Sequence, residues 1–281
     1  MKDKIFDYVE KDNVIYNLSG LSKLICFICM TTAVMYSYDI RFVVCMMIIS
    51  LGLFRVAELK FNQIKTMLLY VVIFLGMNFV LTFIFNPTYG TEIYGTFHEL
   101  FRINDYLIVT AEQLVYQITK TSKYASVVPL GMMFLLTTNP SEFAASLNRA
   151  GISYKGTYAV SLTLRYFPDT VRDYNDIALA QQSRGLDLSK KEKMGTRIKN
   201  IINICVPLIF GTLDRIEMIT NAMDLRGFGK HKKRTWYVTE PLKKNDYIAI
   251  VFAVLVLVAA LFLGFVINGS RFWNPFVVQA L

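Results

Sequence analysis

Charged residues are scarce in this sequence, and its few cysteines and histidines are scattered along the chain. Only 18% of the 281 residues are charged and 54% are hydrophobic, whereas soluble domains carry about a quarter charged residues. The four cysteines lie in apolar stretches, and neither they nor the two histidines have the spacing of zinc ligands. The composition therefore favours a membrane protein and argues against a disulfide framework or a metal site.

Motifs of nucleotide-binding and hydrolytic enzymes are also missing. The stretch Gly151-x-x-x-x-Gly156-Thr157 has the glycine spacing of a phosphate-binding loop, but it lacks the lysine that such a loop requires. The sequence contains no G-x-S-x-G, H-E-x-x-H or G-x-G-x-x-G pattern. We therefore expect no catalytic residue and no bound cofactor on this chain, and we expect His98 and His231 to be solvated.

Long uncharged runs predict membrane-spanning helices, which need about 20 mainly apolar residues. The candidate runs are residues 24–38, 42–54, 66–85, 124–138 and 247–268. The first two are short and predict a helical hairpin around Asp39, with Lys23 and Arg55 reaching from its base toward the membrane surface. Another short run, residues 200–213, predicts a helix packed against the membrane base rather than a span.

Basic residues are concentrated in one part of the chain. Residues 141–245 carry 18 Lys and Arg against 10 Asp and Glu, a net charge of +8. The tail after the last run has Arg271 as its one basic residue. Because positively charged segments stay in the cytoplasm, we expect five spans with the N-terminus inside and the C-terminus outside. Six spans would place one end on the wrong side.

The predicted fold class is an all-α polytopic membrane protein with about five transmembrane helices and long cytoplasmic helices. The predicted divisions are 1–138 for the first four spans, 139–245 for the cytoplasmic segment, and 246–281 for the last span and outer tail. The lipid bilayer is therefore an expected partner. The basic patch 230–234 is interpreted as a contact with anionic lipid rather than with nucleic acid.

The cytoplasmic segment contains helix start and stop signals. Residues 139–142, Asn-Pro-Ser-Glu, have the pattern of a helix start, and Gly151 is the predicted stop. Pro168 is predicted to open a long amphipathic helix that ends at Gly185. After a polar, lysine-rich turn, a second long helix is predicted to end at Gly227.

The two long helices have matching ends. Their sequences are Ala180-x-x-x-Arg184-Gly185 and Ala222-x-x-x-Arg226-Gly227. A single copy would be explained by the preference of cations and glycine for helix C-termini. Two copies in one cytoplasmic segment favour a docking role, because an exposed guanidinium presents five donors that suit carboxylates and carbonyls of another protein.

An acidic face on the first long helix has two interpretations. Asp169, Asp173, Asp176 and Asp187 suggest a metal site, and the first three share one face at steps of four and three residues. They alternate with Arg165 and Arg172, however, so pairing on the helix surface is the favoured interpretation.

Four motifs in this order resemble a known family. They are Thr137-Thr138-Asn139-Pro140, Leu164-Arg165-Tyr166-Phe167-Pro168 and the two matching helix ends. Together they resemble the transmembrane T component (EcfT/CbiQ-like) of energy-coupling factor (ECF) transporters. The resemblance covers most of the chain and is strongest from about residue 135 to 230. The usual family motif is Ala-Arg-Gly, whereas Ser183 and Leu225 precede the arginines here.

The resemblance implies a multisubunit importer of vitamins or metal ions in the cell membrane of a prokaryote. Its partners would be two ABC-type ATPase subunits, which would bind ATP and Mg²⁺, and a membrane-embedded substrate-binding S component. The long helices would be coupling helices that transmit ATP-driven motion. The implied ATPase-docking residues are Ser183, Arg184, Gly185, Leu225, Arg226 and Gly227, supported by Ala180 and Ala222.

The alternative is a multipass membrane enzyme such as a lipid-modifying transferase. That function would need clustered acids, histidines or metal ligands at the membrane face. A self-contained transporter or channel would instead need polar pairs inside its spans. The sequence gives neither pattern in its clear spans.

Overall fold

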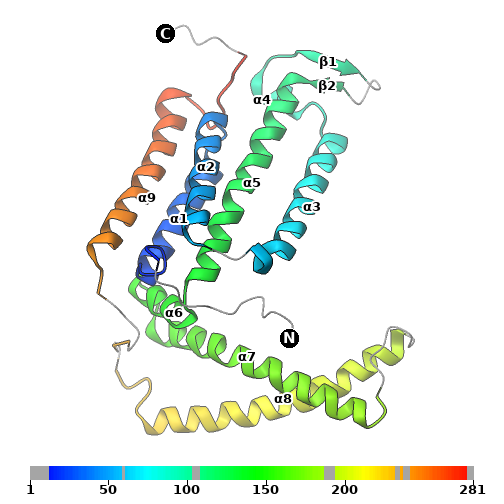
Figure 1. Cartoon of the computed structure of the whole chain (residues 1–281), viewed down its shortest axis with the longest axis vertical. Coiled ribbons are helices and arrows are strands. Elements are labelled where there is room, and N and C mark those ends of the chain that lie inside the picture. The colour runs from blue at the N-terminus through cyan, green and yellow to red at the C-terminus, as the bar shows by residue number, and fades with distance from the viewer. Residues whose placement is uncertain are drawn as a thin grey trace. The chain divides into compact units, whose positions relative to one another are not determined.

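The structure is a computed structural model that describes residues 13–58, 61–102, 108–186, 194–231, 235–236 and 241–276. Most of these residues are helical, which confirms the predicted all-α class (Figure 1). The chain divides into two compact units. Unit 1 consists of residues 1–139 and 240–281, and unit 2 consists of residues 140–239.

Unit 1 is built on five long helices that lie side by side (Figure 1). They are α1 (Gly20–Tyr36), α2 (Ile40–Val56), α3 (Phe61–Phe85), α5 (Ala111–Thr137) and α9 (Lys244–Phe262). Helix α5 is central, because α1, α2 and α3 all contact it, and α9 packs against α1. A π-helical turn, Leu263–Ile267, continues α9.

A short subdomain connects α3 to α5. It consists of α4 (Tyr89–Tyr94) and an antiparallel hairpin of β1 (Glu99–Arg102) and β2 (Ile108–Thr110). The hairpin was not predicted from the sequence.

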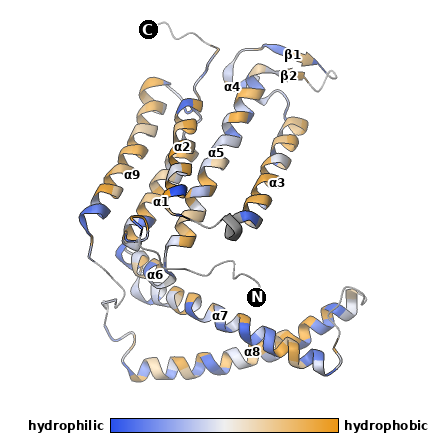
Figure 2. Ribbon diagram, in the orientation of Figure 1, coloured by the Kyte–Doolittle hydropathy of each residue, from blue (hydrophilic) through white to orange (hydrophobic). Residues whose placement is uncertain are grey.

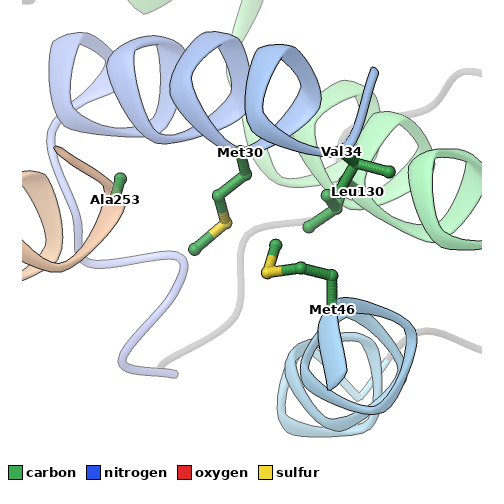
Figure 3. Packing of buried hydrophobic residues seen from close by; sticks show 5 residues of the cluster. All are labelled: Met30, Val34, Met46, Leu130 and Ala253. Carbon is green, nitrogen blue, oxygen red and sulfur yellow. The ribbon is translucent and has the colours of Figure 1, made fainter. Parts of the chain in front are cut away.

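The apolar core of unit 1 draws on four helices. Met30 and Val34 of α1, Met46 of α2, Leu130 of α5 and Ala253 of α9 are all at most 4% exposed. Figure 3 shows the Met30 and Met46 side chains pointing toward one another beside Leu130. Flexible thioether side chains fill irregular gaps between helices, and here they join the hairpin α1–α2 to α5.

Among the described residues, two helices are long and apolar enough to cross a membrane. They are Met67–Phe85 of α3 and Lys244–Ile267, which covers α9 and its π-helical turn. Both are coloured as hydrophobic over most of their length in Figure 2. Most large apolar side chains of the first segment are exposed, as expected for residues that face lipid tails. Helix α1 is a shorter apolar helix.

The prediction that Lys23 reaches the membrane surface is wrong. Its side chain is 6% exposed, and Nζ donates hydrogen bonds of 2.9 Å to the carbonyl oxygens of Tyr16 and Thr137. Helix α1 begins at Gly20, earlier than the uncharged run. Lys23 therefore lies inside the unit, where it joins α1 to the last turn of α5 and satisfies carbonyls that lack partners within a helix.

The first half of α5 carries buried polar side chains that hold neighbouring segments. The Gln113 amide donates to the carbonyl of Asn86 at 2.9 Å and accepts from the amide of Gly90 at 2.7 Å. Glu112 bonds to the His98 ring at 2.6 Å. His98 was expected to be solvated, and although its side chain is 59% exposed, it is also bonded to this fully buried carboxylate.

Unit 2 contains three helices, α6 (Pro140–Arg149), α7 (Tyr154–Ser183) and α8 (Met194–Leu225). Pro168 lies inside α7 and does not open a helix as predicted. The helix starts earlier because the Ser153 side chain accepts a hydrogen bond from the Gly156 amide and caps it. The uncharged run 200–213 is likewise an internal part of α8 rather than a separate helix.

Replacing Gly90 by alanine tests the close approach of α4 to α5. A Cβ atom at this position would lie 2.6 Å from the Cα of Gln113, so backbone must move. We expect Gly90→Ala to lower the free energy of unfolding by about 1–3 kcal/mol, measured as a lower thermal midpoint in detergent. Gly52→Ala is the control, because no atom lies within 4 Å of its Cβ position. Equal midpoints for the two variants would contradict the packing described.

Candidate docking site at two helix ends

The end of α7 is a glycine-terminated cap. Arg184 is the C-cap residue, and Gly185 follows with φ +86°. The Gly185 amide donates to the Gln182 carbonyl at 2.9 Å, and the Leu186 amide donates to the Gln181 carbonyl at 3.1 Å. This pair of bonds is the Schellman motif, which satisfies the last carbonyls of a helix from the backbone itself.

The end of α8 has the same geometry. Arg226 follows the last helical residue, and Gly227 has φ +69°. The Gly227 amide donates to the Asp224 carbonyl at 2.9 Å, and the Phe228 amide donates to the Met223 carbonyl at 3.0 Å. The predicted repeat in sequence is therefore also a repeat in structure, with an arginine at the equivalent position of each end.

The predicted docking residues lie at the surface of unit 2. Ala180, Ser183, Arg184, Gly185, Ala222, Leu225 and Arg226 are exposed, and Gly227 is half-buried. Leu225 is 90% exposed, which is unusual for a large apolar side chain on an ordered helix. Each end thus presents an arginine together with small or apolar neighbours, a combination that suits contact with another protein.

The two helices cross in an antiparallel sense (Figure 1). An ion pair joins them near the crossing, with Arg215 Nη2 of α8 2.7 Å from Asp173 Oδ2 of α7. Arg184 follows Asp173 by eleven residues, and Arg226 follows Arg215 by eleven residues. At the rise of a helix, each arginine lies about 16 Å beyond the ion pair, on opposite sides of the crossing.

An open groove of about 420 Å³ runs between α7 and α8. Its apolar lining includes Leu162, Tyr166 and Phe167 of α7 and Ile216, Ile219 and Met223 of α8. The first half of α8 is also apolar and exposed, and Phe210 is 64% exposed. Large exposed apolar surfaces of this kind mark interaction sites.

The acidic face of α7 is used for ion pairs. Asp169 lies 3.4 Å from Arg172, as the surface-pairing interpretation predicted, whereas Asp173 pairs with Arg215 of α8. Within the described residues, no group of three His, Cys, Asp or Glu side chains could hold a metal ion. In the basic patch, Lys230 and His231 are exposed, while residues 232–234 lie outside the described part of the chain.

Comparisons with known proteins find similarity to membrane components of transporters. A family model described as the cobalt transport protein CbiQ matches residues 11–237. The chain is similar to the energy-coupling factor transporter transmembrane protein EcfT of Limosilactobacillus fermentum, with 37% identity over 103 residues, covering 37% of this chain and 38% of that protein. It is also similar to the EcfT protein of Streptococcus equi subsp. equi, with 24% identity over 276 residues, covering 94% of this chain and 96% of that protein.

A third similarity links the chain to a larger protein. A putative ABC transporter ATP-binding protein of Bifidobacterium longum is 28% identical over 163 residues, covering 55% of this chain and 21% of that protein. The chain therefore spans about two fifths of the Limosilactobacillus relative and about one fifth of the Bifidobacterium relative.

Alanine at the two capping glycines tests the helix-end geometry. The left-handed conformation costs a residue with a Cβ about 1–2 kcal/mol, so Gly185→Ala and Gly227→Ala should each loosen the helix end. We expect faster hydrogen exchange at the amides of Leu186 and Phe228, respectively. Gly195→Ala, in the first turn of α8 with no atom within 4 Å of its Cβ position, should leave both amides unchanged. Unaltered exchange in all three variants would rule out these caps.

Proposed function

This chain belongs to the family of cobalt transport proteins described as CbiQ, and we propose from that premise that it is the transmembrane coupling component of an energy-coupling factor transporter. The observation that carries the proposal is the pair of arginines at equivalent positions of two exposed helix ends. The similarity to EcfT proteins along 94% of the chain supports it.

The proposed partners at the arginines are two ABC-type ATPase subunits, one for each helix end. A guanidinium at a helix C-cap can donate to carboxylates and carbonyls of a groove in the partner. The Schellman bonds already satisfy carbonyls at the ends of α7 and α8. Arg184 and Arg226 are both exposed, so a partner can reach their guanidinium groups. ATP and Mg²⁺ would bind on the ATPase subunits.

The proposed mechanism is mechanical coupling. ATP binding and hydrolysis move the two ATPase subunits relative to each other, and Arg184 and Arg226 carry that motion into α7 and α8. The apolar surfaces of these helices then slide against a membrane-embedded substrate-binding S component and reorient it. Charge-assisted bonds suit ends that stay docked, while apolar contacts suit surfaces that slide, because they lack directionality.

The chain itself is a non-catalytic subunit. No metal-binding group occurs in the described residues, and the sequence carries none of the enzyme motifs sought. The relatives are transmembrane transport components, so the multipass enzyme alternative has no support. The S component would determine whether a vitamin or a metal ion is imported.

Charge reversal at both arginines tests the docking role. We expect the double variant Arg184→Glu and Arg226→Glu to reduce recovery of the ATPase subunits in a detergent pull-down by more than tenfold, because each reversal removes charge-assisted bonds and introduces repulsion. Membrane insertion should be unchanged. Arg197→Glu makes the charge change of one such reversal near the start of α8 and should leave recovery intact. Full recovery with the double variant would exclude docking through these residues.

The proposed topology has five spans, α1, α2, α3, α5 and α9, with unit 2 in the cytoplasm and the hairpin β1–β2 outside. The excess of basic residues in 141–245 supports this orientation.

Cysteine labelling tests this orientation. In a variant with the four native cysteines replaced by serine, a membrane-impermeant maleimide should label Phe101→Cys in intact cells. It should label Leu225→Cys only after permeabilisation. The reverse labelling pattern would overturn the orientation.

A further inference from the structure

We propose that an aromatic clamp formed by Tyr154, Tyr158, Phe228 and Trp236 positions the Arg226 end of α8, whereas no equivalent clamp is present at the Arg184 end of α7 within the described residues. The two docking ends are therefore mechanically unequal. This inference rests on the proposed function, in which both ends bind ATPase subunits, and it names further positioning residues for one of them.

The rings of the clamp form a continuous chain of contacts. The Phe228 centroid lies 5.3 Å from that of Tyr154 and 4.9 Å from that of Tyr158. Tyr158 in turn lies 6.3 Å from Trp236. Aromatic pairs at these separations stabilise one another beyond the area they bury. Since Phe228 follows Arg226 by two residues, the ring contacts act directly on the helix end.

Hydrogen bonds fix the clamp to the backbone. The Gly229 amide donates to the Tyr154 hydroxyl oxygen at 2.8 Å, and Tyr154, which is 7% exposed, is the first residue of α7. The indole Nε1 of Trp236 donates to Oδ1 of Asn148 in α6 at 3.1 Å. The end of α8 is thereby joined to the start of α7 and to α6.

Phe228 links the ring contacts to the cap itself. Its amide makes the Schellman bond to the Met223 carbonyl, so its backbone closes the helix end and its side chain holds that end against α7. The position of the Arg226 Cα is consequently set by both the cap and the clamp.

The other helix end lacks this arrangement. Leu186 occupies the position that corresponds to Phe228, and it has no ring to contribute. For residues 174–186, no ring contact, ion pair or side-chain hydrogen bond to any other described element is present. Beyond Asp173, α7 still packs through Ala178, which is 7% exposed, but in the described part of the chain the Arg184 end has no ring contact or side-chain hydrogen bond to another element.

Unequal support has a consequence for binding. An end that is already held loses less conformational freedom when a partner binds, so less of the interaction energy is spent on ordering it. The Arg226 end is held by both its cap and the clamp, whereas the Arg184 end has its cap but no clamp and therefore loses more conformational freedom on binding. Loosening the clamp should then weaken binding at Arg226 and leave binding at Arg184 unaffected.

The sharpest test removes one hydroxyl group. Tyr154→Phe deletes the acceptor of the Gly229 amide and keeps the ring, while Tyr158→Phe is the matched control, because no hydrogen bond of its hydroxyl is found within the described residues. Dissociation constants of ATPase subunits for the full chain in detergent are measured in Arg184→Ala and Arg226→Ala backgrounds. We expect Tyr154→Phe to weaken binding about fivefold with Arg184→Ala and to have no effect with Arg226→Ala.

Equal weakening in the two backgrounds would show a general structural role and would overturn the proposal. If neither arginine variant alone weakens binding, the docking function fails, and the clamp is judged by a second measurement on the chain without ATPases. In that measurement of hydrogen exchange, the backbone amides of residues 224–229 should exchange more slowly than those of residues 182–186. Tyr154→Phe should remove at least half of the difference in exchange rate between the two groups. Equal exchange at the two ends of the unmodified chain would overturn the clamp whatever happens to docking.

Discussion

The last carbonyls of a helix need hydrogen-bond donors, and the way this chain supplies them determines its candidate site. At both α7 and α8 the donors are backbone amides of a left-handed glycine turn. No side chain is required for either cap, because the backbone amides supply the donors. The carbonyls at the end of α5 are treated differently, because Lys23 donates to Thr137 there. That lysine is buried, whereas Arg184 and Arg226 are exposed.

The two units differ in where their polar groups lie. In unit 1, polar side chains such as Gln113 and Glu112 are buried and bond to neighbouring segments, while apolar side chains of α3 face outward. In unit 2, ion pairs and arginines lie at the surface beside exposed apolar groups such as Leu225. The first arrangement is that of a protein surrounded by lipid. The second is that of a surface that contacts other proteins.

Local features were predictable from the sequence, and long-range ones were not. The arginine-glycine ends were found because a helix stop depends on a few adjacent residues. The partner of Asp173 could not be found, since Arg215 is 42 residues away and reaches it only when α7 and α8 cross. Lys23 was misplaced for the same reason, because Thr137 lies 114 residues further along. The error at Pro168 was local, since the capping signal at Ser153 was overlooked.

The antiparallel crossing and the clamp together form a three-sided frame. One side is the first half of α7, and the second is the last part of α8. The third is the set of contacts that Phe228, Gly229 and Trp236 make with Tyr154, Tyr158 and Asn148. Three elements that are joined at each pair of ends keep the angles between them unless one element changes length. A load applied at Arg226 would therefore turn the frame as a whole. The second half of α7, which carries Arg184, would rotate together with the frame.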